Sequence, residues 1–128
     1  MKVYVASAYG NREHVQEVFT ILQDAGHVVS HDWTTESADH LPHGSPEYYR
    51  YLEQCGARDY LGIMDAHVLL LLAHPEMKDT RTELGIALGC GMQILVVDHP
   101  EVHSVFYGHH RVTRYPTVDA AIYALAQY

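Results

Sequence analysis

Short β-type segments alternate with amphipathic helical segments along the whole sequence, and this alternation limits the fold more than any other feature. Segments rich in Val, Ile, Leu and Tyr predict strands at residues 2–7, 27–30, 67–73, 93–97 and 110–114. Apolar residues at helical spacing predict helices at residues 12–25, 47–64, 80–91 and 117–127, with one further helical turn at 102–107. Such alternation is typical of a parallel sheet with helices on both faces. The sequence therefore predicts a three-layer, doubly wound α/β fold of the flavodoxin or Rossmann type.

For five parallel strands we expect the order 2-1-3-4-5, whose switch point lies between the first and third strands. That order brings the loop at residues 7–12 beside the loop at residues 73–83. Ligands of open parallel sheets bind at this position, so we expect the functional site between these two loops. With 128 residues, the chain is long enough for one domain with its own core, and we assign residues 1–128 to it.

Composition limits the possible partners and the compartment. The net charge of −8 argues against a nucleic-acid polymer or an anionic membrane as partner, but not against a small anionic ligand. No apolar run is long enough to span a bilayer, no signal peptide is evident, and the two cysteines suggest no disulfide framework, so we expect a cytoplasmic protein. The eleven histidines are scattered without a ligand set, and we expect no metal.

A carboxylate, Glu83, lies in the first turn of the helix that follows the most apolar strand. Two interpretations are open. Thr80 and Glu83 fit the Ser/Thr-x-x-Glu capping box, in which both residues serve only the helix end. Alternatively, Glu83 is a catalytic carboxylate, because it comes just after the carboxyl end of a buried strand.

A second acid interrupts the apolar stripe of the helix at residues 47–64. The inward positions of this stripe are Tyr48, Leu52, Cys55, Asp59 and Ile63. An acid on a buried face needs a partner or a function. We expect either an ion pair of Asp59 with Arg58 or Arg81, or a role in the site.

The loop at residues 31–46 is unusually long for a compact domain, which indicates a functional segment. Its one large aromatic residue is Trp33. We expect Trp33 either to belong to a partial lid over the site or to pack on the edge of the sheet.

The loop at residues 7–12 runs directly into a helix. Its backbone amides, the Ser7 hydroxyl and the Arg12 guanidinium predict an anion cradle, although neither a Walker loop nor a dinucleotide fingerprint is present. A carboxylate beside such a cradle, with no Ser-His-Asp order, fits cleavage of a glycosidic bond.

Four segments carry a resemblance to a known family. They are ARDYLGI at residues 57–63, TELGIALG at 82–89, ILVV at 94–97 and VYVAS at 3–7. In these the chain resembles the nucleoside 2-deoxyribosyltransferase superfamily, including its deoxynucleoside 5′-monophosphate N-glycosidase branch. The resemblance implies that Glu83 is a nucleophile that forms a covalent sugar ester, that Tyr4 positions it, and that Asp59 protonates the leaving base.

The resemblance also implies binding residues and an assembly. The segment with Ser7, Tyr9, Gly10, Asn11 and Arg12 is similar to the phosphate-binding loop of the monophosphate branch, and Asp79 borders the same site. Ser104 resembles a serine that, in the monophosphate branch, reaches the phosphate from a neighbouring subunit, and Phe106 stands in the place of a hydrophobic site residue. This implies a homodimer or a higher homo-oligomer. No cofactor is implied.

Two positions depart from the family pattern. His67 stands where an acid is usual, and Asp79 stands where a glycine is usual. A carboxylate at position 79 is unfavourable beside a phosphate. The expected function is cleavage of the N-glycosidic bond of a nucleoside or its 5′-monophosphate, with release of the base or transfer of the sugar. The alternatives are a nucleotide-binding sensor without catalysis and a hydrolase of a nicotinamide nucleotide.

Overall fold

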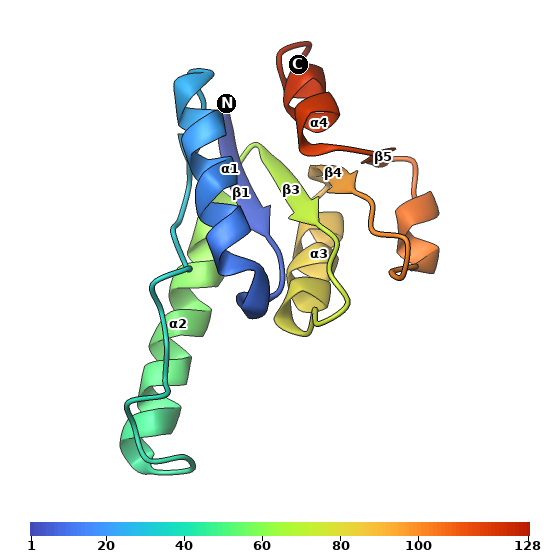
Figure 1. The fold of residues 1–128 in the computed structure, drawn as a ribbon. Helices are drawn as coiled ribbons and strands as arrows, with labels where there is room; N and C mark the ends of the chain where they lie inside the picture. The colour runs from blue at the N-terminus through green and yellow to red at the C-terminus, as the bar shows by residue number, and fades with distance from the viewer.

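The computed structural model describes residues 1–128 and contains one five-stranded parallel sheet (Figure 1). Its strands are β1 (Lys2–Ala6), β2 (Val28–Val29), β3 (Val68–Leu72), β4 (Gln93–Val97) and β5 (Val112–Tyr115). They lie in the order β2-β1-β3-β4-β5, and every neighbouring pair is parallel. The predicted fold class and strand order are therefore confirmed.

Helices cover both faces of the sheet. They are α1 (Arg12–Asp24), α2 (Pro46–Asp65), α3 (Asp79–Gly89) and α4 (Val118–Leu125), with short 3₁₀ helices η1 (Tyr9–Asn11) and η2 (Val105–Gly108). Right-handed crossovers place α2 and α3, which contact each other, on one face, and α1 and α4 on the other (Figure 1). No helix has the length and apolar character that a membrane crossing requires.

The three central strands form the core because their side chains are apolar on both faces. All five residues of β3 are buried, and they pair in register with β1 and β4, as in Leu70 opposite Val5 and Leu95. Continuous apolar runs of this kind are typical of parallel strands with helices on both sides. The resulting rigid centre fixes where the loops after β1 and β3 begin.

Helix α1 packs as predicted, whereas α2 does not. Val15, Val18, Phe19 and Leu22 of α1 are buried. In α2 only Gly62 and Ile63 are buried, so the expectation of an inward apolar stripe is wrong over most of this helix. The reason is length: α2 extends beyond the end of the sheet, where the loop after β2 runs alongside it (Figure 1).

Candidate active site

A cleft of about 660 Å³ opens beyond the carboxyl ends of β1 and β3, between the two loops that the strand order brings together. Its walls come from the segment after β1, the loop after β2, α2, the loop after β3 and the start of α3. The residues that line it are Ser7, Ala8, Tyr9, Gly10, Trp33, Glu36, Ser37, Ala38, Asp39, Tyr51, Leu52, Cys55, Asp59, Glu76, Lys78, Asp79, Thr80 and Glu83. This cleft is the position at which open parallel sheets bind their ligands.

Glu83 lines the cleft and is only 9% exposed. The hydroxyl of Tyr4, a fully buried residue of β1, donates a hydrogen bond to Oε2 of Glu83. The capping box expected from Thr80 and Glu83 is wrong, because α3 begins one residue earlier than predicted. Lys78 is the N-cap residue, no side chain caps the helix, and Thr80 already lies inside it.

The surroundings of Glu83 favour its uncharged form. Burial raises the pKa of Glu83 to about 8; the hydrogen bond from Tyr4 opposes this shift, and the charges of Asp59 and Asp79 add to it. Burial and the charge of Glu83 also raise the pKa of Tyr4, so Tyr4 keeps its proton and remains a donor. A carboxyl with so strongly perturbed a pKa, facing a cleft, is a candidate functional group on physical grounds.

Asp59 reaches the cleft from α2, and its partner is a histidine. Nε2 of His31 lies 3.2 Å from Oδ1 of Asp59 and 2.5 Å from Oε1 of Glu36. The expected ion pair of Asp59 with Arg58 or Arg81 is wrong. Arg58 instead approaches Glu36, with Nη2 3.5 Å from Oε2, because neighbouring residues on a helix point in different directions.

Asp59 holds a proton more readily than an ordinary aspartate. Burial and the nearby charge of Glu36 raise its pKa to about 6, while His31 lowers it. Tyr4, Asp59 and Glu83, which come from three separate elements, are thus brought to one site.

His31 and Glu36 are site residues that the sequence analysis missed, because they lie in a loop without periodicity. One signal pointed to them: Gly62, a glycine inside α2. A Cβ atom at position 62 would lie 2.6 Å from Cβ of His31 and 3.1 Å from Cε2 of Tyr4. A glycine within a helix costs stability, and it is therefore a sign of close approach by another part of the chain.

His31, Glu36 and Asp59 are also the group whose donor types suit a divalent cation. Each offers one ligand atom, and the three atoms lie within 4.8 Å of one another. The prediction that the protein holds no metal remains a prediction.

Only part of the loop at residues 7–12 lines the cleft. Ser7, Tyr9 and Gly10 line the cleft, while Asn11 donates to the Ser7 hydroxyl over 3.0 Å. Ser7 itself donates to the backbone oxygen of Leu72 over 2.7 Å. The Arg12 guanidinium lies 4.6 Å from the centre of the Tyr9 ring and is not among the lining groups.

Trp33 packs at the edge of the sheet, which is one of its two expected roles, and it also lines the cleft. It is 8% exposed and lines the cleft, and its indole nitrogen donates to the backbone oxygen of Val5 over 2.7 Å. Strand β2 has only two residues, so the edge of β1 lacks a partner strand at Val5. Trp33 supplies the missing hydrogen bond and fixes the loop to the sheet.

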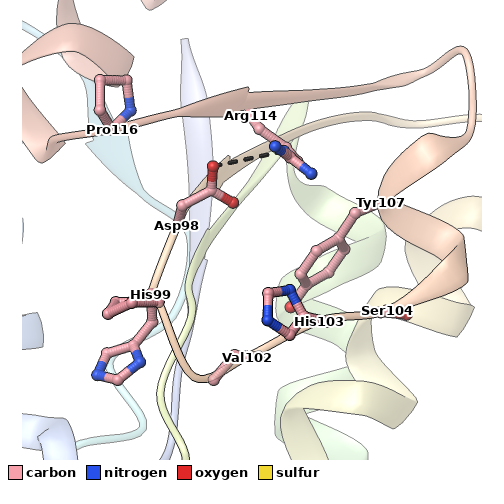
Figure 2. A pocket seen from close by; sticks show the side chains of 9 residues that line it. Asp98, His99, Val102, His103, Ser104, Tyr107, Arg114 and Pro116 are labelled. Atoms are coloured by element: carbon pink, nitrogen blue, oxygen red, sulfur yellow. Dashed lines mark ion pairs between the residues drawn. The ribbon is translucent and has the colours of Figure 1, made fainter.

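Ser104 and Phe106 lie outside this cleft. Ser104 caps η2 by accepting a hydrogen bond from the backbone of Phe106, whose side chain is 57% exposed. Ser104 instead lines a second cavity of about 400 Å³ together with Tyr107 and with Arg114, whose Nε lies 3.4 Å from Oδ2 of Asp98 (Figure 2). Within one subunit, then, these two predicted site residues do not meet Glu83.

Comparisons with known proteins identify the fold. The sequence matches no protein-family model and no curated protein. The structure of a CMP N-glycosidase of Clostridium botulinum aligns over 100% of both chains, with a TM-score of 0.66 and 20% identity. A 2-deoxyribosyltransferase of Bacillus psychrosaccharolyticus aligns over 95% of this chain and 90% of its own, with a TM-score of 0.74 and 19% identity. This protein therefore shares its fold with these two enzymes.

Proposed function

We propose that this protein cleaves the N-glycosidic bond of a nucleoside or nucleotide, with Glu83 as the nucleophile. The observation that carries the proposal is the buried hydrogen bond from Tyr4 to Glu83, a residue that lines the cleft. A carboxyl group is rarely buried without a cation, and none of the ion pairs of the protein includes Glu83. The named activities of the two structural neighbours, a nucleotide N-glycosidase and a deoxyribosyltransferase, support the same chemistry.

In the first step, an oxygen of ionised Glu83 attacks C1′ of the sugar. The bond from C1′ to the base nitrogen breaks, and its electron pair goes to the base, which takes a proton from Asp59. The products are a sugar ester of Glu83 and the free base. The pKa of about 6 suits Asp59 to this task, because an acid catalyst works best with a pKa near the working pH.

In the second step, water or a second base attacks C1′ of the ester. The attacking group gives its proton to the carboxylate of Asp59, and Glu83 leaves as a carboxylate. Water gives a hydrolase, and a second base gives a transferase. The hydroxyl of Tyr4 orients Glu83 in both steps and stabilises its ionised form, as its opposing effect on the pKa of Glu83 indicates. These side chains perform the reaction without a cofactor.

A panel of substrates tests the proposal. The protein is incubated with ribo- and deoxyribonucleosides, their 5′-monophosphates and NAD, and free base is measured by chromatography. We expect release from at least one compound and complete loss of release in Glu83→Gln, with the fold checked by circular dichroism. Intact-protein mass spectrometry after acid quenching is expected to show one added sugar on the wild type and none on the variant.

The control is Glu13→Gln, which removes an exposed carboxylate outside the cleft. Undiminished base release by a folded Glu83→Gln variant would refute the role of Glu83. If no compound is cleaved but one raises the melting temperature, the protein is a binding protein and the proposed function is wrong.

A further inference from the structure

The cleft carries a strongly one-sided charge. Its acidic lining residues are Glu36, Asp39, Asp59, Glu76, Asp79 and Glu83, and its only basic lining residue is Lys78. Even with Glu83 protonated near neutral pH, carboxylates outnumber the single cation. Low-dielectric walls concentrate such a field, so the cleft repels anions.

The loop that the sequence analysis expected to hold a phosphate already faces a carboxylate of the protein. Oε2 of Glu76 lies 2.6 Å from the point that a Cβ atom on Gly10 would occupy. The glycine therefore leaves room for this carboxylate against the backbone of the loop.

Two of the polar side chains expected to bind phosphate from this loop, those of Ser7 and Arg12, are engaged elsewhere. The Ser7 hydroxyl donates to the backbone of β3. The Arg12 guanidinium donates to the backbone oxygen of Tyr9 over 3.3 Å and lies over the Tyr9 ring. No cation from this loop offsets Glu76 within the cleft.

We infer that the site takes an unphosphorylated nucleoside, and that Glu76 excludes a 5′-phosphate from the loop after β1. This inference rests on the proposed function and specifies its substrate. A carboxylate and a phosphate about 5 Å apart repel each other enough to lower affinity about tenfold, even where water screens them well. Asp79, at the start of α3, adds to the repulsion.

The test compares each nucleoside with its own 5′-monophosphate in wild type, Glu76→Gln and the control Glu13→Gln. The kcat/KM ratio of nucleoside to monophosphate is expected to exceed about tenfold in the wild type. In Glu76→Gln the ratio is expected to fall about tenfold, mainly through the KM of the monophosphate. Glu13→Gln is expected to keep the wild-type ratio. Raised salt is expected to lower the ratio of the wild type, because it screens the repulsion.

The outcomes separate this inference from the proposed function. A preference for the monophosphate, or a ratio that Glu76→Gln leaves unchanged, overturns the inference while base release still supports the function. If neither compound is cleaved, calorimetric binding of the same pairs decides the inference. If the wild type binds the nucleoside more tightly than the monophosphate and Glu76→Gln loses this preference, the inference is upheld. If the wild type binds the monophosphate as tightly or more tightly, the inference is overturned.

Discussion

At the scale of single residues, the site combines two carboxyl groups whose surroundings differ. Glu83 is buried beside a neutral hydroxyl, while Asp59 is half-buried beside a histidine. Burial raises both pKa values, but the raised value is about 8 for Glu83 and about 6 for Asp59. Separated pKa values commonly divide the tasks of acid and nucleophile in an active site, but here the proposed nucleophile, Glu83, is the group with the higher value.

These values predict a particular pH profile. The reactive form needs ionised Glu83 and protonated Asp59, which is the less common arrangement of the two protons. We expect kcat/KM to rise with pH below about 6, to stay level between about 6 and 8, and to fall above about 8. The profile is measured on the best substrate over this range. If kcat/KM falls steadily as the pH is raised from 5, with no rising limb, the assignment of Glu83 as nucleophile is contradicted.

His31 is expected to position Asp59. In His31→Leu the pKa of Asp59 rises further, because His31 normally lowers it and Glu36 then loses its nearest partner. The rising limb of the profile should move to higher pH, and kcat should fall about tenfold because Asp59 is no longer held in place. The control is His14→Leu, on the exposed side of α1. If kcat falls but the rising limb of the pH profile stays at the same pH, the role of His31 is purely structural.

At the scale of elements, the contact between α2 and the site depends on Gly62. Gly62→Ala would force the new Cβ against Cβ of His31 and the ring of Tyr4. We expect a loss of about 1–3 kcal/mol in the free energy of unfolding, together with reduced base release. The measurement is urea unfolding followed by circular dichroism.

Gly56 on the same helix supplies the matched control, because nothing lies within 4 Å of a Cβ placed there. Gly56→Ala is expected to stabilise the protein by about 0.5–1 kcal/mol, since alanine is the better helix former. Equal effects of the two substitutions would show that Gly62 has no packing role.

Helices and strands could be predicted from the sequence better than the contacts between side chains. The apolar runs of β1, β3 and β4 predicted the centre of the sheet. Strands without a polar face have to be covered by helices on both sides, so they belong in the middle of a parallel sheet. Glu83 stood out by its place in the first helical turn after the most apolar strand, and Asp59 because it interrupts the apolar stripe predicted for residues 47–64. The partner of Asp59 could not be predicted, because His31 lies in a loop whose course is set by contacts such as the bond from Trp33 to β1. The start of α3 shifted by one residue, which removed the predicted cap.

At the scale of the whole molecule, two groups of large apolar residues lie exposed on the surface. Leu61 of α2 is 63% exposed and its neighbours Tyr60 and Met64 are about half exposed, while Val105 and Phe106 of η2 also face outward. Exposed apolar patches commonly mark interfaces between proteins, so each of these two groups is a candidate contact between subunits. Since Ser104 and Phe106 lie outside the cleft of their own subunit, we propose a homodimer in which they complete the site of the partner.

Sedimentation tests the assembly, and subunit mixing tests the shared site. We expect a mass of twice 14.5 kDa for the wild type, and a monomer with little activity for Leu61→Arg.

Glu83→Gln and Phe106→Ala are each expected to be inactive alone. After mixing and exchange of equal amounts, half of the dimers are mixed, and each mixed dimer has one site with both native residues. Activity should therefore return to about a quarter of the wild-type value, as random pairing of subunits requires. An active Phe106→Ala homodimer, or no recovery on mixing, would show that each subunit builds its site alone.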